Sequence, residues 1–557
     1  MRAFFQSILV ALPILATCGQ SMQAQSASPA TNIGHEIAGV VLNARTGLPI
    51  RDVEVTVFRS KDNSLVVQTA TDAEGRFSVP QLPDDKYSLR ASRRGYIPAA
   101  FEEHENGSTA IVTGKGLIST GLRFMLAPQA VISGVVTDDS GDPVPGAMVS
   151  LYRQDPRVGT GKAVRANGTG ADEQGNYEIA NLAPGSYFLS VTATPWYATH
   201  RPTPNGAQPK ASQPRSPLDV AYPATYYPDA ADSSFAAPIA VNAGERVPIN
   251  ITLHPVPAIH ITMQLPVTGP NGQVSMPQLQ REVFGYPDGV QANISSATSG
   301  EPAGPHSVTT VEISGIAPGA YDMELNNPNG ESSRATAIDL NSDQAIDLSS
   351  TTPLAEISGK VAMAGGDSPP SSLVVILTPE QSQNQASAPV EPDGSFHIHS
   401  VRPGIYEFAI YTVNVFGYAM TTTRLTANGA TLKGHLLTVG GEPVTLTATL
   451  ADSTASVNGF AKLDGKSASG IFLELIPKNA AAGRAAFAVN QSDSDGSFNF
   501  LHVLPGEYTL VAIQEGWMLD WTDPQAMAPY LPKGLKVTVP PHSQEINLKD
   551  SVEVQPK

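Results

Sequence analysis

The sequence predicts an all-β protein, a tandem array of about five antiparallel β-sandwiches. Three observations predict this class: apolar and polar residues alternate along short segments, a turn motif recurs at a fixed spacing, and no segment carries a sustained helical stripe of apolar residues. Gly and Pro, 48 and 47 of the 557 residues, supply many turns. At roughly 100 to 200 residues per domain, a chain of this length contains several domains.

A turn motif and the tyrosine that follows it define the repeat. The motif reads acidic–x–x–Gly–x–aromatic, and in four units a Tyr lies 12 residues after the turn Gly: Gly75 and Tyr87, Gly175 and Tyr187, Gly394 and Tyr406, and Gly496 and Tyr508. The acidic residue accepts backbone N–H bonds, the Gly takes a positive φ, and the aromatic residue two positions later points into the core. Each unit is therefore expected to contain a hairpin here, and the Tyr begins the following strand.

Strands account for the other elements of a unit. An apolar–x–Gly–apolar segment opens four units, as at residues 37–40 and 132–135, and an alternating segment closes a unit, as at residues 122–126. Period-two segments such as Val53–Val57 and Phe472–Ile476 predict half-buried strands. A sandwich of about 100 residues buries enough surface to fold alone, so we expect separate sandwiches in a row.

The spacing of the repeat sets the expected domain boundaries. We expect a signal peptide followed by five sandwiches: residues 1–24 for the signal peptide, then 32–128, 129–256 with a Pro/Tyr-rich insertion at 195–238, 257–354 in degenerate form, 355–453 and 454–550. The linkers are short and contain proline, as at residues 127–130 and 254–257. Such linkers predict a semi-rigid rod.

The N-terminal segment predicts export. Arg2 supplies a positive charge, and Phe4–Ala16 is an apolar run too short to span a bilayer. The single cysteine, Cys18, leaves two alternatives open: free secretion, or a lipid anchor at Cys18. Beyond residue 24 no apolar run approaches the roughly 18 to 20 residues of a transmembrane helix. The protein is therefore expected in the periplasm, at the outer-membrane surface or in the medium.

Charge excludes one class of partner. The chain has 34 Lys and Arg against 51 Asp and Glu, a net charge of −17, which repels phosphate backbones. We therefore expect no nucleic-acid partner. The partner expected instead is a polysaccharide or a cell-envelope protein.

Several motifs together resemble the carboxypeptidase regulatory-like domain. The second unit carries the closest matches, Gly141–Ala147 and Leu182–Tyr187, and the first unit carries Asp72–Phe77 and Gly95-Tyr96. The third unit keeps only Gly315–Tyr321. The resemblance implies a transthyretin-like sandwich of seven strands, often grouped with starch-binding-like folds. In carboxypeptidases this domain is an accessory to a separate zinc domain, so the resemblance implies no activity.

Sequence motifs for catalysis are missing, and we expect no enzyme activity, no cofactor and no metal. His397 and His399 share one face of a predicted strand and could supply two metal ligands. Because the neighbouring Phe396 and Ile398 should face inward, exposure to solvent is the favoured interpretation. Residues 493–497 have carboxylates spaced as in part of a calcium loop but no closing Glu, and a turn is favoured there.

Aromatic residues supply the candidate ligand site. The three tryptophans follow the Tyr strand of the second and fifth units, among prolines and further tyrosines. The candidates for ligand binding are Trp196, Tyr197, Tyr226, Tyr227, Trp517, Trp521 and Tyr530. Two interpretations stay open: these rings stack on sugars, or they pack and close the open end of a sandwich.

The functional prediction is a non-catalytic, exported bacterial protein that binds polysaccharide through these aromatic loops. Linked weak sites gain effective concentration, which suits a repeated architecture. The alternative is a structural scaffold or spacer of the cell envelope that engages protein partners through exposed strand edges.

Overall fold

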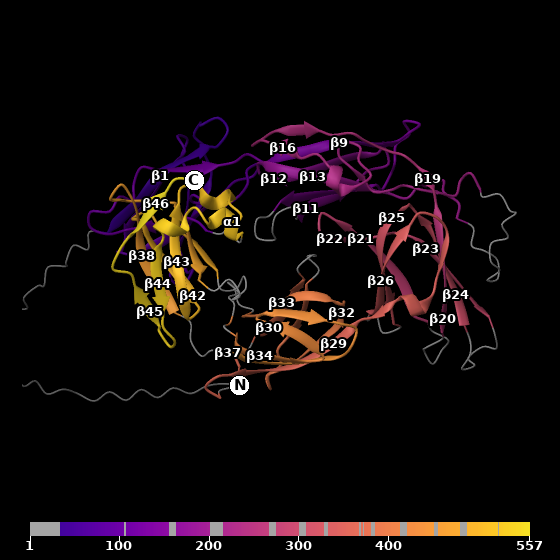
Figure 1. Cartoon of the computed structure of the whole chain (residues 1–557). Coiled ribbons are helices and arrows are strands. Elements are labelled where there is room, and N and C mark those ends of the chain that lie inside the picture. Colours follow the sequence, from indigo (N-terminus) through magenta and orange to yellow (C-terminus); the bar gives the residue numbers. More distant parts are fainter. Residues whose placement is uncertain are drawn as a thin grey trace, which may run out of the picture.

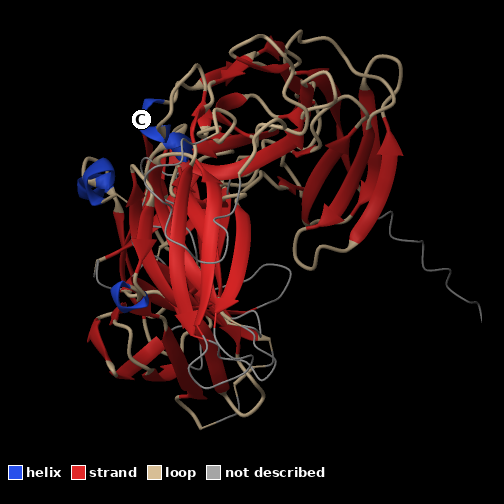
Figure 2. Ribbon diagram, turned by 90° about the vertical axis from the view of Figure 1, so that its right-hand side faces the viewer, coloured by secondary structure: helices blue, strands red, loops and turns tan. Residues whose placement is uncertain are grey.

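A computed structural model describes most of the chain from residue 34 onward. The described residues are 34–104, 107–154, 163–200, 216–266, 274–299, 308–327, 332–366, 369–370, 372–379, 385–412, 420, 422–450, 455–478, 487–521 and 523–557. They form strands β1 to β46, short 3-10 turns and one four-residue α-helix, α1 (Pro524–Met527), so the all-β prediction is confirmed (Figures 1 and 2). The expected signal peptide and Cys18 lie outside these residues. Within the described ranges, no helix has the length and apolar character needed to cross a membrane.

The first two sandwiches each contain one small and one larger sheet. The first consists of β1 (His35–Asn43), β2 (Glu54–Arg59), β3 (Leu65–Ala70), β4 (Arg76–Leu82), β5 (Lys86–Ser92), β6 (Ala99–Ala100), β7 (Ile111–Val112) and β8 (Leu122–Leu126). Its sheets have the orders β4-β1-β8 and β3-β2-β5-β6, with β7 also paired to β5. The second consists of β9 (Ala130–Asp138), β10 (Met148–Gln154), β11 (Ala163–Gly170), β12 (Asn176–Leu182), β13 (Gly185–Thr192), β14 (Val220–Ala221), β15 (Thr225–Tyr226), β16 (Ile239–Val241), β17 (Arg246–Pro248) and β18 (Ile251–Leu253). Its sheets have the orders β12-β9-β17 and β11-β10-β13-β15.

The third and fourth sandwiches each pair a four-stranded with a five-stranded sheet. The third follows β19 (Val256–Pro257) and consists of β20 (Ile259–Pro266), β21 (Met276–Val283), β22 (Tyr286–Gly289), β23 (Asn293–Ser299), β24 (Val308–Ile316), β25 (Gly319–Asn326), β26 (Ser332–Leu340), β27 (Gln344–Ile346) and β28 (Thr352–Pro353). Its sheet orders are β23-β24-β20-β27 and β22-β21-β25-β26-β28. The fourth consists of β29 (Ala355–Met363), β30 (Leu373–Pro379), β31 (Ala386–Pro389), β32 (Ser395–Val401), β33 (Gly404–Thr412), β34 (Thr422–Asn428), β35 (Ala430–Lys433), β36 (Leu436–Val439) and β37 (Val444–Leu450). Its sheet orders are β32-β29-β37-β34 and β31-β30-β33-β36-β35.

The two sheets of the fifth sandwich are joined at one edge by a shared strand. Its strands are β38 (Ala455–Leu463), β39 (Lys466–Ser467), β40 (Phe472–Pro477), β41 (Ala488–Gln491), β42 (Ser497–Val503), β43 (Gly506–Ile513), β44 (Leu535–Val539), β45 (Glu545–Asn547) and β46 (Val552–Gln555). Strand β46 pairs with β38 in one layer and with β43 in the other, so the two layers share one strand. The short helical segments η7 (Gly516–Met518) and α1 lie between β43 and β44.

The closing strand of each sandwich pairs in parallel with the opening strand, which the antiparallel expectation did not include. Strand β8 pairs in this way with β1, β17 and β18 with β9, β27 with β20, β37 with β29, and β45 and β46 with β38. This close approach explains the glycine of the opening segment. A Cβ at Gly134 would lie 1.6 Å from the carbonyl oxygen of Ile249.

The hydrophobic core divides into five large clusters. They span residues 37–126, 130–253, 259–346, 355–450 and 455–554, and each draws side chains from both layers of one sandwich. The exact domain ranges expected from the repeat stay predictions, and these clusters are the observation that supports them.

The repeated turn forms as expected. Gly75, Gly175, Gly394 and Gly496 have φ between 72° and 86°, and the aromatic residue two positions later is buried in each turn. The Tyr also has a function that its spacing did not predict. In all five sandwiches its hydroxyl donates a hydrogen bond to the carbonyl four residues earlier, at 2.7–3.2 Å, from Tyr87, Tyr187, Tyr321, Tyr406 and Tyr508.

The first and fifth sandwiches contact each other, so the predicted rod is wrong (Figure 1). Lys86 Nζ lies 2.5 Å from the Asp493 carboxylate, and the Ala110 amide donates to the same side chain at 3.2 Å. The buried Gln491 amide donates to the hydroxyl of Thr109 at 2.8 Å. The rod prediction fails because polar groups of these two sandwiches, far apart in the sequence, bond each other directly.

The Asp493 turn closes through its backbone, with the Gly496 amide donating to the Asp493 carbonyl at 2.8 Å, but its acidic side chain takes part in the contact with the first sandwich. Asp72 and Asp172 accept backbone amide bonds from Arg76 and Asn176 within their own turns, at 2.8 and 2.7 Å. In the fifth sandwich the acidic side chain accepts from Lys86 instead. Burial raises the pKa of Asp493, and the Lys86 charge partly opposes that shift.

Candidate functional site

The insertion of the second sandwich presents an exposed tryptophan, Trp196, beside a half-buried tyrosine, Tyr197. Trp196 is 79% exposed, and its ring meets that of Tyr197 edge-on, with centroids 5.7 Å apart and planes at 88°. The Ala198 amide donates to the carbonyl of the buried Pro195 at 3.0 Å and closes the turn that carries Trp196. The Thr199 amide donates to the Leu218 carbonyl at 2.8 Å. A folded loop therefore holds Trp196 out in solvent.

Tyr226 and Tyr227 lie elsewhere in the insertion and pack against protein. Tyr226 is buried, and its ring lies 5.7 Å from that of Phe284 in the third sandwich. Burial raises the pKa of the Tyr226 hydroxyl to about 12. Tyr227 is half-buried against the core of the second sandwich. These contacts favour the packing interpretation for this pair and join the second sandwich to the third.

Trp517, Trp521 and Tyr530 form a third group, on the outer face of the fifth sandwich. They pack with Phe472 and Met527 in one apolar cluster. Trp517 is only 8% exposed and stacks on His104 of the first sandwich, with ring centroids 4.6 Å apart and planes at 7°. The seven predicted residues therefore fall into three places, and of their three tryptophans Trp196 has the freest face. Ligand binding by the others stays a prediction.

A buried carboxyl group, that of Glu474, lies beneath the segment that contains η7 and α1. Glu474 of β40 is fully buried, and neither carboxylate oxygen has a hydrogen-bond partner. Its neighbours across the sheet are Val489 and Val511, and desolvation holds its pKa well above the usual range. The alternation of β40 predicted a half-buried strand, but η7 and α1 cover its second face.

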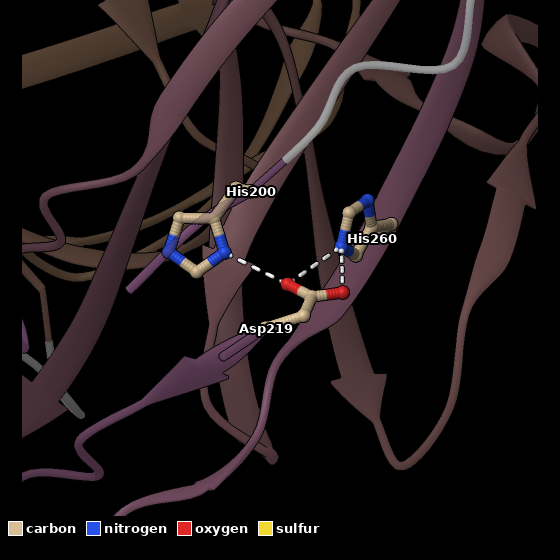
Figure 3. A group of neighbouring side chains, drawn as sticks. All are labelled: His200, Asp219 and His260. Atoms are coloured by element: carbon tan, nitrogen blue, oxygen red, sulfur yellow. Dashed lines mark hydrogen bonds and ion pairs between the residues drawn. The ribbon is translucent and has the colours of Figure 1, made fainter. Parts of the chain in front are cut away.

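A cluster of ionisable side chains lies where the insertion meets the third sandwich (Figure 3). His200 Nδ1 lies 2.8 Å from Asp219 Oδ1, and His260 Nε2 lies 2.9 Å from Asp219 Oδ2. His260 Nδ1 lies 2.8 Å from a Glu312 oxygen. The four side chains are between 3% and 14% exposed, so this is an almost fully buried network.

The position of His260 between two carboxylates determines its charge preference. Burial lowers the pKa of His260, but the hydrogen bond with Glu312 and the charge and hydrogen bond of Asp219 outweigh it, so the pKa is raised. An imidazolium can donate to both carboxylates at once. The cluster can therefore hold a cation, a proton in the simplest case, at Nε2 of His260.

Sequence reasoning missed this cluster. Its members come from the insertion loop, from the residue before β14, from β20 and from β24, at spacings of 19, 41 and 52 residues that match no ligand motif. The one available signal was indirect, since the expected insertion at 195–238 contains both His200 and Asp219.

The histidines that sequence reasoning did consider lie at the surface. His397 and His399 are exposed on β32, and the alternate residues Phe396 and Ile398 are buried, as expected. Their rings stack with centroids 5.2 Å apart, and His399 Nδ1 lies 2.7 Å from Glu356. This exposed group has the same ligand types as the buried cluster but none of its enclosure.

Comparison with known proteins bears on the first part of the chain. The sequence model of the carboxypeptidase regulatory-like domain matches residues 36–113 and 131–254. The predicted resemblance is confirmed. The two carboxypeptidase regulatory-like segments correspond to the first and second sandwiches, and the second includes Trp196, His200 and Asp219. A search of curated proteins finds no match.

Solved structures with similar segments include several pilins. The minor pilin of Streptococcus agalactiae is 15% identical, with 40% of this chain and 97% of that chain covered and a TM-score of 0.20. The shaft pilin SpaA of Lactobacillus rhamnosus GG is 11% identical over 40% of this chain and 96% of that chain, with a TM-score of 0.19. A streptococcal ancillary pilin is 12% identical over 56% and 99%, with a TM-score of 0.18. Scores this low establish no shared overall arrangement.

Proposed function

We propose that this chain is a non-catalytic, exported binding protein whose sandwiches hold an aromatic surface for polysaccharide. The observation that carries the proposal is the exposure of Trp196 beside Tyr197 on a loop with a folded base. Two rings at a steep angle offer one flat face and one edge to a sugar, and the indole face suits the apolar C–H side of a pyranose. The hydroxyl of Tyr197 interacts with the side chain of the buried Tyr222, which anchors this ring beside the indole.

The contacts that hold the loop of Trp196 and Tyr197 in place preorganise it for binding. The loop is tied to Leu218, and the insertion is packed against the third sandwich through Tyr226 and Phe284. A site that is already rigid loses less conformational entropy when it binds. The net charge of −17 favours neutral polysaccharide over anionic polysaccharide.

A second candidate function is a structural scaffold of the cell envelope. The closed contact between the first and fifth sandwiches favours it, because Lys86, Thr109 and Ala110 are engaged by Gln491 and Asp493 in a contact within the chain. A scaffold function would not need the aromatic loop, but it would need the contact between the first and fifth sandwiches.

Retention of the chain from residue 25 onward on neutral and anionic polysaccharides tests the proposal. Trp196→Ala should weaken retention on a neutral polysaccharide at least tenfold, the loss expected when a central aromatic contact worth about 1.4 kcal/mol or more is truncated. Phe235→Ala is the matched control, since Phe235 is a 78% exposed aromatic residue of the same insertion that lies outside the pair. Equal retention of both variants and the parent would overturn the glycan proposal and favour the scaffold.

A further inference from the structure

We propose that His200, Asp219 and His260 form a binding site for a divalent transition metal, with Zn²⁺ as the best-suited ion. The site would tie the Trp196 loop to the third sandwich. Its three ligand types, two imidazoles and a carboxylate, are those that zinc sites use. This inference does not depend on the proposed function, because it concerns how the loop is held and not what the loop binds.

The ligand atoms converge on one point. One donor atom from each residue lies within 4.8 Å of the other two. Asp219 Oδ1 lies 2.8 Å from His200 Nδ1 and 3.2 Å from His260 Nε2, and the second oxygen, Oδ2, lies 2.9 Å from His260 Nε2. Ligand atoms of a tetrahedral zinc ion lie about 3.3 Å apart when each bond is about 2.0–2.1 Å. Small side-chain movements therefore suffice to admit the ion.

The surroundings of the ligands are those of a metal site. Glu312 binds the second ring nitrogen of His260, the carboxylate–histidine arrangement that orients a metal ligand and raises its basicity. The Asp343 carboxylate accepts the backbone amide of His260 at 2.9 Å and fixes that end of β20. The His260 ring is thus held from behind while its Nε2 points at Asp219 (Figure 3).

The third sandwich also leaves room for the ring of His200. Gly315, at the end of β24, has a φ of +81°, and a Cβ there would lie 2.8 Å from His200 Nε2. His200 and Asp219 of the insertion therefore pack against β24 and β20 of the third sandwich. Burial of three ionisable groups is costly in isolation, and a bound cation would neutralise Asp219.

The ligand set also selects among ions. Two imidazole nitrogens suit Zn²⁺ and its transition-metal neighbours, whereas Ca²⁺ and Mg²⁺ take oxygen ligands. Three protein ligands leave one position of a tetrahedral ion for water or for the second Asp219 oxygen.

Calorimetric titration with ZnCl₂ tests the site, using the metal-free chain from residue 25 onward. All proteins carry His397→Ala and His399→Ala, which remove the exposed histidine group. In this background we expect one tight site, lost on His200→Ala with His260→Ala. Glu312→Gln, which leaves all three ligands in place, should weaken zinc binding about 10- to 100-fold. Titration with CaCl₂ should give no binding at this cluster.

Two further readouts separate metal binding from a folding defect. Circular dichroism at each step checks that a variant keeps its strand content, and Co²⁺ bound to the parent should show the visible absorption of a low-symmetry nitrogen–oxygen site. Zinc should also raise the melting temperature of the parent but not of the doubly substituted variant. Undiminished zinc binding after loss of His200 and His260, or no zinc binding by the folded parent, would overturn the proposal.

Discussion

Replacing Glu474 with methionine should stabilise the fifth sandwich, and the structure indicates by how much. Both carboxylate oxygens are buried without a partner among apolar neighbours. An unsatisfied buried polar group costs about 1–3 kcal/mol. Methionine has a similar length and enough flexibility to fill the space, so Glu474→Met should raise the free energy of unfolding by about 1–3 kcal/mol at pH 4, where the carboxyl is largely protonated in both states, and by more at pH 7.

The difference in unfolding free energy between Glu474→Met and its parent should increase with pH. The pKa of Glu474 is raised in the folded state, so the folded chain holds this proton over a pH range in which the unfolded chain releases it. Wild-type stability is therefore highest below the unfolded pKa of about 4.3 and falls by up to about 1.4 kcal/mol per pH unit as the pH rises toward the folded pKa. Glu474→Met lacks this slope, so its advantage should grow with pH.

Tryptophan fluorescence provides the assay. In a Trp196→Phe background the remaining tryptophans, Trp517 and Trp521, both report on the fifth sandwich. Denaturant unfolding of the chain from residue 25 onward at several pH values then gives the stability difference. Glu474→Gln is the matched control, because it removes the titration but keeps a buried polar group. A Glu474→Met protein that is less stable than its parent at pH 7, or equally favoured at pH 4 and pH 8, would refute the reasoning.

Three other substitutions test the fold and its closure. Lys86→Ala removes the cation beside Asp493, so small-angle scattering should show a larger radius of gyration as the first and fifth sandwiches separate; an unchanged radius would contradict the contact. Gly134→Ala places a Cβ against the closing strand and should lower the free energy of unfolding by about 1–3 kcal/mol or more. Gly170→Ala is the control, because the space around Gly170 is open, and equal melting curves for the two variants would contradict the steric argument. Tyr187→Phe removes one hydroxyl bond and should cost about 0.5–1.5 kcal/mol by chemical denaturation, with no loss counting against that bond.

Local features of the fold could be predicted from the sequence because short-range chemistry determines them. The turn needs an acceptor, a positive φ and an inward aromatic ring within six residues, so Asp172, Gly175 and Tyr177 identify it on their own. Strand alternation likewise identifies buried faces. The hydroxyl bond of Tyr187 was not foreseen, since the spacing placed the residue but not its hydroxyl.

Contacts between distant parts of the chain could not be predicted in this way. Lys86 and Asp493 are 407 residues apart, and nothing in either local sequence specifies the other. The same limit applies to the tryptophans. Trp196 and Trp517 occupy equivalent positions after a Tyr strand, yet docking against His104 buries one and leaves the other exposed. The His200–Asp219–His260 cluster likewise exists only where two sandwiches meet.

The central claim is that a polysaccharide contacts the Trp196 surface, and fluorescence quenching tests it most directly. The parent and Trp196→Phe are each titrated with the neutral polysaccharide that retains the chain, and acrylamide quenching is measured at every step. The difference between the two proteins isolates the quenching of Trp196. We expect the exposed indole to become protected from acrylamide, with saturation at the polysaccharide concentration that saturates retention. Unchanged quenching of Trp196 in chain that is fully bound to polysaccharide would contradict the account and place the binding surface elsewhere.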